Sequence, residues 1–338
     1  MNIIEFANRI GVSPTTVSRA LSGHGRISET TRHMIQQRME EFGYVPNPHA
    51  QSLVTGRSRM ILLHHSDRSV LSDMFLVEMA HGIQQALERE GYGLLLDTAH
   101  AGLGVEDSPL VSHWIHSRAV DGVIIKPQRP DRALVEQFAD TGIPCVVIGG
   151  PSMIGMPRVG AVSVQLDEGV REAAELFIEM GHRRIGFIGT ALPDRALEVF
   201  RSRLVSAGAD LPEDMVRIEG LDPEDGARAM RSLLSTANPP TAVFVRLDTL
   251  AVGAIHAAGE MGARVPEDVS VIGYGDIPMA GMLNPPLTTV RVGFFELGMM
   301  AMNMLFELIN DPDSQGRAEF VGTTLIKRNS VASVLQRD

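Results

Sequence analysis

The chain has few of the residues that build disulfide-bonded or aromatic-rich proteins, and no long apolar run. It contains one cysteine, one tryptophan and three tyrosines among 338 residues. The single Cys145 excludes an intramolecular disulfide framework and fits a reducing compartment. No apolar run reaches the roughly 20 residues of a membrane-spanning helix, and the first residues lack the features of a signal peptide. We therefore expect a cytoplasmic protein with no membrane partner.

Motifs for cofactor binding and catalysis are also missing. The glycines at 149–150 and 186–189 follow predicted strands, but they lack the Gly-x-Gly-x-x-Gly order of a dinucleotide site. His64 and His65 are adjacent, so in a regular strand they point to opposite faces and cannot chelate one metal ion together. We find no nucleophile elbow and no P-loop. We therefore expect no enzyme activity, no cofactor and no metal site.

The charge of the chain is unevenly distributed. Residues 1–60 carry seven arginines and four glutamates, a net charge of +3. The whole chain carries −11, which leaves −14 on the remaining residues. At this length we expect about two or three domains. A basic N-terminal segment on an acidic body favours contact with a polyanion through that segment alone.

The first 22 residues carry the start and stop signals of two short helices. Asn2 and Glu5 have the spacing of a capping box, and Gly11 permits a tight turn. Ser13 followed by Pro14 is a strong start for the second helix. We expect that helix to bury three apolar residues, Val17, Ala20 and Leu21. This order is typical of a helix-turn-helix, whose second helix enters the DNA major groove. A plain three-helix bundle is the alternative.

The exposed side chains of the second helix suit DNA. The guanidinium of Arg19 matches the two acceptors of guanine, and Thr15 can offer a hydroxyl or a methyl group to a base. Pro14 offers apolar contact only. Three hydroxyl residues are better placed for phosphates: Ser13, Thr16 and Ser18. A third helix from Ser28 to Gly43 and a short helix from His49 to about Val54 follow. The short helix is marginal alone in water, so we expect it to order on docking.

From Met60 onward, short β-rich runs alternate with helical stretches. The predicted strands are 60–65, 93–97, 122–126, 145–149, 162–165, 185–189, 215–218, 241–245 and 270–274. The predicted helices are 73–89, 106–117, 131–141, 168–180, 195–207, 223–235, 248–261 and 276–282. This alternation predicts an α/β core of two doubly wound parallel-sheet lobes. The cleft between the lobes is the expected ligand site.

Several strings resemble those of the lactose-repressor (LacI/GalR) family of bacterial transcription regulators. They are Gly11–Leu21, Gly43–Asn47, Ala50, Ser52–Leu53, Thr55–Arg57, Val120–Ile125, Gly181–Gly189, Val265–Tyr274 and Pro286–Arg291. The resemblance covers nearly the whole chain. It implies a periplasmic-binding-protein-like core whose lobes are joined by three crossings, which we place near 160, 290 and 320.

The resemblance also implies a division into domains. Residues 1–46 are expected to form the DNA-binding head, residues 47–59 the hinge helix and linker, and residues 60–338 the effector-binding and dimerisation core. Lobe 1 is expected to hold about 60–160 and 291–319. Lobe 2 is expected to hold about 161–290 and 320–338.

In this family the hinge leucine wedges into the minor groove, and Leu53 matches it. Such a wedge kinks the duplex. The full set of candidate DNA-binding residues is Ser13, Pro14, Thr15, Thr16, Ser18, Arg19, Arg26, Asn47, His49, Ala50, Ser52 and Leu53. Two heads and two hinges would match a pseudopalindromic operator on double-stranded DNA, so we expect a homodimer. A tetramer stays open, although no heptad pattern follows Ile326.

The expected effector pocket departs from the family pattern. Positions that are often polar fall on Gly149, Ala196, Leu247, Gly275 and Val292. The candidate effector-binding residues are Ser66, Asp67, Phe75, Lys126, Arg195, Arg246, Asp248, Tyr274 and Asp276. Because arginine binds carboxylate and phosphate bidentately, an anionic sugar derivative is one hypothesis. A pocket that has lost its ligand is the other.

These features together predict a sequence-specific DNA-binding transcription regulator. We expect a repressor whose operator affinity is controlled by a small-molecule effector, a sugar or sugar derivative, in the cleft between the lobes. Lobe movement on binding would change the spacing and order of the hinge segments. The alternatives are an effector-independent regulator with a degenerate pocket and a solute-binding protein, which would have no use for residues 1–56. An enzyme is a third alternative, without a recognisable catalytic set.

Overall fold

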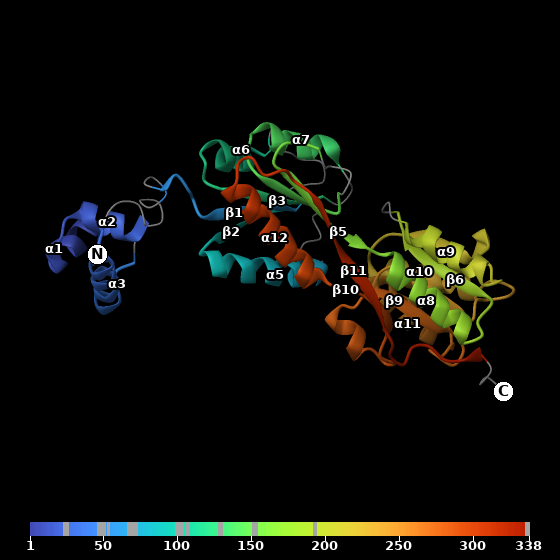
Figure 1. The fold of residues 1–338 in the computed structure, drawn as a ribbon. Coiled ribbons are helices and arrows are strands. Elements are labelled where there is room, and N and C mark those ends of the chain that lie inside the picture. Colours follow the sequence, from blue (N-terminus) through green and yellow to red (C-terminus); the bar gives the residue numbers. More distant parts are fainter. Residues whose placement is uncertain are drawn as a thin grey trace.

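The computed structural model describes residues 1–22, 27–45, 52, 55–65, 74–98, 105, 108–127, 131–150, 155–191 and 195–334. Three helices form an N-terminal head, and two α/β lobes form the core (Figure 1). The chain passes from the head into the first strand of lobe 1. Within the ranges described, no helix combines the length and the apolar character needed to cross a membrane.

The head consists of α1 (Ile3–Ile10), α2 (Pro14–Ser22) and α3 (Glu29–Phe42). The predicted capping box of α1 is confirmed, since the Asn2 side chain accepts the Glu5 N–H at 3.0 Å and the Glu5 carboxylate accepts the Asn2 N–H at 3.0 Å. Ser28 caps α3, as expected. Short-range signals therefore fix where these helices begin.

A small apolar core holds the three helices of the head together. Its buried members are Phe6, Ala7, Val17, Ala20, Ile35 and Tyr44. The rings of Phe6 and Tyr44 stack with centroids 4.3 Å apart. Burying a side chain the size of phenylalanine or isoleucine contributes about 1.5–3 kcal/mol. The head thus has a core of its own.

Lobe 1 is built on five parallel strands in the order β2-β1-β3-β4-β5. These are β1 (Met60–His65), β2 (Gly93–Asp97), β3 (Gly122–Lys126), β4 (Cys145–Ile148) and β5 (Val159–Gln165). Helices α5 (Met74–Glu90) and α12 (Phe294–Asn310) pack on one face of this sheet. Helices α6 (Pro109–His116) and α7 (Arg132–Asp140) pack on the other. Both faces are covered, which is why the strands are almost wholly apolar.

Lobe 2 repeats this plan around one large apolar core. Its strands are β6 (Ile185–Thr190), β7 (Val216–Glu219), β8 (Ala242–Val245), β9 (Ser270–Gly275) and β10 (Thr288–Val292). Its helices are α8 (Asp167–Glu179), α9 (Ala196–Ser206), α10 (Pro223–Leu234) and α11 (Asp248–Glu260). Two short 3-10 helices, η2 (Glu213–Met215) and η3 (Pro278–Met282), complete it. The predicted α/β alternation is confirmed.

One long strand, β11 (Ala318–Ile326), belongs to both lobes (Figure 1). Its first half runs parallel to β5, from Ala318 to Gly322. Its second half, from Thr323, runs antiparallel to β10. The two parallel-sheet lobes that we expected are thus present, and β11 joins them into one eleven-stranded sheet.

The chain crosses between the lobes a few residues later than we expected. β5 stays in the lobe 1 sheet as far as Gln165, and β10 continues to Val292 before Gly293 opens the turn into α12. β11 changes partner between Gly322 and Thr323. The expected positions near 160, 290 and 320 were early because the strand at 162–165 was assigned to lobe 2, and because β10 and β11 were not predicted as strands.

Candidate functional site

Helix α2 presents two polar side chains on its outer face. Thr15 and Arg19 are both exposed, and their four-residue spacing puts them on one side of the helix. Val17 and Ala20 are buried on the opposite side. Within the described residues, Arg19 has no carboxylate partner, so its guanidinium is available to a ligand outside the chain.

Ser13 and Thr16, at the start of α2, form the hydrogen bonds that cap the helix. Ser13 Oγ accepts the N–H of Thr16 at 3.0 Å, and the two hydroxyl oxygens lie 2.8 Å apart. Pro14 and Ser18 are half-buried. Ser52 is described, and its carbonyl accepts the N–H of Gly56 at 2.8 Å. The other DNA-binding candidates lie outside the described residues: Arg26, Asn47, His49, Ala50 and Leu53.

A cavity of about 350 Å³ lies where the two lobes meet. Lobe 1 contributes Phe75 and Glu78 from α5, and Phe294 and Glu296 from the first turn of α12. The rings of Phe75 and Phe294 lie with centroids 4.7 Å apart. Lobe 2 and the crossing strands contribute a second set: Gly275, Asp276, Ile277, Pro278, Arg291 and Arg328. We call this the interlobe cavity.

Asp276 is the best-anchored charge in the interlobe cavity. Its Oδ2 accepts from Arg291 Nε at 2.6 Å, and its Oδ1 accepts from Arg328 Nη2 at 2.6 Å. The side chain is only 6% exposed, so this charge is neutralised by its own neighbours. Arg291 lies on β10 and Arg328 follows β11. The three side chains therefore tie the turn after β9 to both crossing strands.

Residue 275, next to Asp276, is a glycine because the ring of Phe75 leaves no space for a side chain there. A Cβ at Gly275 would lie 2.5 Å from Phe75 Cε1, and the backbone has a φ of +131°. No side chain fits there without moving the ring. The polar residue that the family pattern led us to expect at this position is thus replaced by an aromatic wall.

Asp248 lies beneath the interlobe cavity rather than on its surface. It is fully buried, and it accepts the hydroxyl of Thr289 at 2.7 Å and the N–H of Ile277 at 3.0 Å. Burial raises the pKa of this carboxyl to about 6, although the two hydrogen bonds act in the opposite direction. Its contacts join β10 to the turn at 276–277. Asp248 is therefore placed to position Asp276.

The remaining effector candidates do not gather at the interlobe cavity. The guanidinium of Arg246 lies over the ring of buried Tyr274, 4.0 Å from its centroid. Arg195 is 68% exposed, 3.7 Å from Asp167, in a separate groove between α8 and α9. Lys126 is half-buried at the end of β3. Ser66 and Asp67 lie outside the described residues.

Of the nine candidates, Phe75 and Asp276 line the cavity. Six other lining residues with charged or aromatic side chains were not among the candidates: Glu78, Arg291, Phe294, Phe295, Glu296 and Arg328. Arg291 could have been found from the sequence, because it is the last residue of the Pro286–Arg291 string that resembles the family. Arg328 carried none, since its position depends on β11.

The lining of the interlobe cavity suits a polyhydroxylated small molecule. Two aromatic rings can pack against the C–H groups of a sugar ring, and carboxylates accept hydrogen bonds from hydroxyls. The carboxylates of Glu78, Asp276 and Glu296 outnumber the two arginines. The basic residues that we expected there, Lys126, Arg195 and Arg246, do not line this cavity, and its two arginines are paired with Asp276.

Comparison with known proteins gives the same two parts. Residues 2–47 match the family described as bacterial regulatory proteins, lacI family, and residues 174–331 match a periplasmic binding protein-like domain. The transcriptional repressor PurR of Erwinia tasmaniensis is 33% identical over 345 residues, covering 99% of this chain and 98% of its own.

The transcriptional regulator CelR of Thermobifida fusca is 30% identical over 327 residues, covering 95% of both chains. A solved structure of a complex of the regulator CelR with cellobiose has a TM-score of 0.73 at 28% identity. That similarity covers 98% of this chain and 99% of the other. The likeness thus extends over the head and both lobes.

Proposed function

Because the chain belongs to the lacI family of bacterial regulatory proteins, we propose that it represses transcription by binding operator DNA through α2. A small molecule in the interlobe cavity controls that binding. The observation that carries the proposal is the outer face of α2, where Thr15 and Arg19 are exposed above a buried apolar face. Such a helix can enter a major groove without uncovering the core of the head.

Arg19 is the proposed base-reading residue. Its guanidinium can bond to O6 and N7 of a guanine, while Thr15 contacts a neighbouring base. Ser13, Thr16 and Ser18 are the proposed phosphate contacts. Two heads in a homodimer would read two half-sites about 34 Å apart, and a tetramer would double this arrangement. The site of action is the bacterial cytoplasm, where the operator lies.

Residues 47–54 are the proposed hinge helix, with Leu53 as the minor-groove wedge. Leu53→Ala is expected to weaken operator binding and to reduce the bend of the DNA. A circular-permutation gel shift measures that bend directly. An unchanged bend would remove the wedge from the mechanism.

For the effector we propose a neutral sugar in preference to an anionic derivative. A solved structure of a CelR complex holds cellobiose, and the interlobe cavity of this chain offers phenylalanine rings and three carboxylates. Its two arginines, Arg291 and Arg328, are already paired with Asp276. An anion would have to break those pairs, whereas sugar hydroxyls can use the free oxygen lone pairs around them.

The coupling between effector and operator is a population shift. Phe75 and Phe294 belong to lobe 1, and Asp276 belongs to lobe 2, so a ligand between them favours one spacing of the lobes. Lobe 1 is continuous with the linker to the head. A ligand that binds one spacing more tightly changes the population of hinge-ordered molecules, and with it the operator affinity.

The DNA-binding claim is tested by paired arginine variants of the head. Arg19→Ala should lose about 1–3 kcal/mol on the cognate site and much less on random DNA. Arg38→Ala is the matched control, because Arg38 is an exposed arginine of α3 that pairs with Glu41. Footprinting and fluorescence anisotropy give both affinities. Equal losses for the two variants on cognate and random DNA would contradict a base-reading role.

The effector claim is tested by thermal unfolding of the full chain against neutral sugars, sugar acids, sugar phosphates and purines. A ligand at a hundred times its dissociation constant adds about 2.7 kcal/mol of stability. A shift with a neutral sugar supports the proposal, and a shift with an anionic sugar alone favours the derivative. No shift across the panel would favour the second candidate, a regulator whose pocket no longer binds a ligand.

A further inference from the structure

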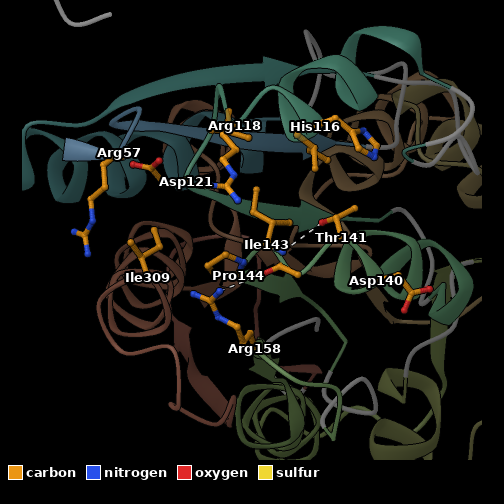
Figure 2. Close-up of a pocket in the computed structure, with 14 residues that line it drawn as sticks. Arg57, His116, Arg118, Asp121, Asp140, Thr141, Ile143, Pro144, Arg158 and Ile309 are labelled. Carbon is orange, nitrogen blue, oxygen red and sulfur yellow. Dashed lines mark hydrogen bonds between the residues drawn. The ribbon is translucent and has the colours of Figure 1, made fainter. Parts of the chain in front are cut away.

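A second large cavity lies at the opposite end of lobe 1 from the interlobe cavity. It has a volume of about 630 Å³ and opens where the strands β3, β4 and β5 begin (Figure 2). Gly56 and Arg57 of the linker, residues 55–59, form one wall. We call this the linker cavity. The effector mechanism described above makes no use of it.

Three arginines from separate segments surround the linker cavity: Arg57, Arg118 and Arg158. Arg57 comes from the linker, Arg118 from the turn after α6, and Arg158 from the turn before β5. Figure 2 shows their side chains spaced around the hollow, with Ile143 and Pro144 drawn between the last two. The wall between the arginines is partly apolar, including Ile115 and Ile309.

Among the described residues, no carboxylate forms an ion pair with any of these three arginines. Arg203, by contrast, pairs with Glu175 at 2.8 Å, and many other surface arginines are paired in the same way. Arg57 donates to the amide oxygen of Asn310, and Arg158 donates to the carbonyls of Gly142 and Leu308. The Nε atom of Arg158 is buried without a partner. The side chain of Arg118 has no hydrogen-bond partner within the described ranges.

The two carboxylates of the cavity do little to neutralise the arginines. Asp121 is engaged by the linker: its Oδ1 accepts the N–H of Ser58 at 2.8 Å, and its Oδ2 accepts the N–H of Arg59 at 2.9 Å. Asp140 is exposed at the end of α7, on the side of the hollow away from Arg57 (Figure 2). The cavity is thus a positive site on a body that is otherwise strongly acidic.

The backbone holds two of the arginines in an uncommon conformation. Arg118 has a φ of +54° and Arg158 a φ of +57°, in the left-handed region that favours glycine and asparagine. Turns with this backbone conformation are usually formed by small residues. Keeping two long cationic side chains at such turns is consistent with a ligand that needs them.

We infer that the linker cavity binds an extended anion that bears more than one phosphate group. Guanidinium groups bind phosphate bidentately, and their spacing around the hollow suits several phosphates better than a single carboxylate. The cavity volume is within the range of small-molecule sites. Two sources share this chemistry: a free polyphosphate ester, and the backbone of the operator next to the head.

Binding here would act on the linker directly. An anion held by Arg57, Arg118 and Arg158 bridges the linker to the turns before β3 and β5. It would fix the segment that joins the head to lobe 1 without entering the interlobe cavity. The inference therefore adds a second input to operator binding, and it stands independently of which sugar the interlobe cavity takes.

The test is a calorimetric titration of the full chain with inorganic tripolyphosphate at constant ionic strength. Arg118→Asn is the informative variant, because asparagine tolerates the left-handed backbone and removes the charge. It should weaken tripolyphosphate binding at least tenfold. Arg132→Gln on α7 is the matched control, an exposed arginine paired with Glu136 outside the cavity, and it should bind as the wild type does.

Operator binding in phosphate-free buffer separates the two sources. If Arg118→Asn leaves operator affinity unchanged, the ligand is a free polyphosphate ester. If it lowers operator affinity and reduces the salt slope by about one, the phosphates are those of the DNA backbone. Both results support the site.

Two results would overturn the inference. One is tripolyphosphate binding that Arg118→Asn does not alter but Arg291→Gln or Arg19→Ala removes, which would place the anion in the interlobe cavity or on the head. The other is the absence of tripolyphosphate binding together with unchanged operator affinity in Arg118→Asn.

Discussion

The head and the interlobe cavity present their functional side chains in opposite ways. In the head, one short helix sets both faces: Thr15 and Arg19 point outward because Val17 and Ala20 point inward. The interlobe cavity takes its lining from α5, the turn after β9, and the two crossing strands. A change in the head should therefore act locally, whereas a change below the cavity should be felt by several distant segments.

The largest effect is expected for Asp248→Ala, which breaks the network under the interlobe cavity. The variant leaves the hydroxyl of Thr289 and the N–H of Ile277 without their acceptor and opens a buried space. We expect a loss of about 2–4 kcal/mol in the free energy of unfolding. Urea unfolding at pH 5, below the raised pKa of Asp248, measures it without a contribution from charge burial. A midpoint equal to that of the wild type would contradict the proposed network.

A somewhat smaller effect is expected for the dependence of the unfolding free energy on pH. The pKa of Asp248 is about 6 in the folded chain and near its usual 3.8 when unfolded, so between these values the folded state binds the extra proton. Stability should fall by about 2–3 kcal/mol as the pH rises from 4 to 6. Asp248→Asn keeps hydrogen-bonding atoms at this position but does not titrate. Its unfolding free energy should therefore lose this part of the pH dependence, and an identical slope in both proteins would rule the assignment out.

A local effect of about 1 kcal/mol is expected for Ser13→Ala in the head, because the variant removes the cap of α2. Hydrogen exchange should speed up in the amides of α2 and leave those of α8 unchanged. Ser28→Ala, which removes the cap of α3, is the matched control within the head. Faster exchange throughout lobe 2 would show that the head and core are not energetically separate.

The smallest effect is expected for Arg195→Gln. Arg195 is largely exposed, and its distances to Asp167 and Glu198 are 3.7 and 3.9 Å. We expect a change in unfolding free energy within about 0.5 kcal/mol and no change in effector affinity. Thermal unfolding with and without the effector measures both. A large loss of effector affinity would bring Arg195 back into the ligand site.

Most of the fold followed from local patterns in the sequence. The caps at Asn2, Ser13 and Ser28 act over three residues, so they could be recognised without knowledge of the rest of the chain. The alternation of strands and helices in the core could likewise be predicted from local patterns of apolar residues. β10 and β11 were not predicted as strands. They carry the chain between the lobes on either side of α12, and they pair antiparallel, unlike the parallel strands within each lobe.

The ligand site could be predicted only in part, for the same reason. Asp276 comes just after the Val265–Tyr274 string, whereas Arg328 reaches the cavity only because β11 runs through both lobes. Arg246 and Arg195 were predicted as ligand residues from their charge, but Arg246 stacks on Tyr274 and Arg195 is exposed just before α9. The sequence showed which side chains could bind a ligand, but it did not show which of them are buried or paired and which line the cavity.

The central claim is that a ligand in the interlobe cavity controls operator binding by the head. The most direct test measures the affinity of the full chain for DNA upstream of its own gene, with and without the sugar that shifts thermal unfolding, in the wild type and in Phe75→Ala. We predict that the sugar changes the operator affinity of the wild type between about 5- and 150-fold. Phe75→Ala should bind the operator normally and lose that response. A Phe75→Ala protein that responds as the wild type does would contradict the account.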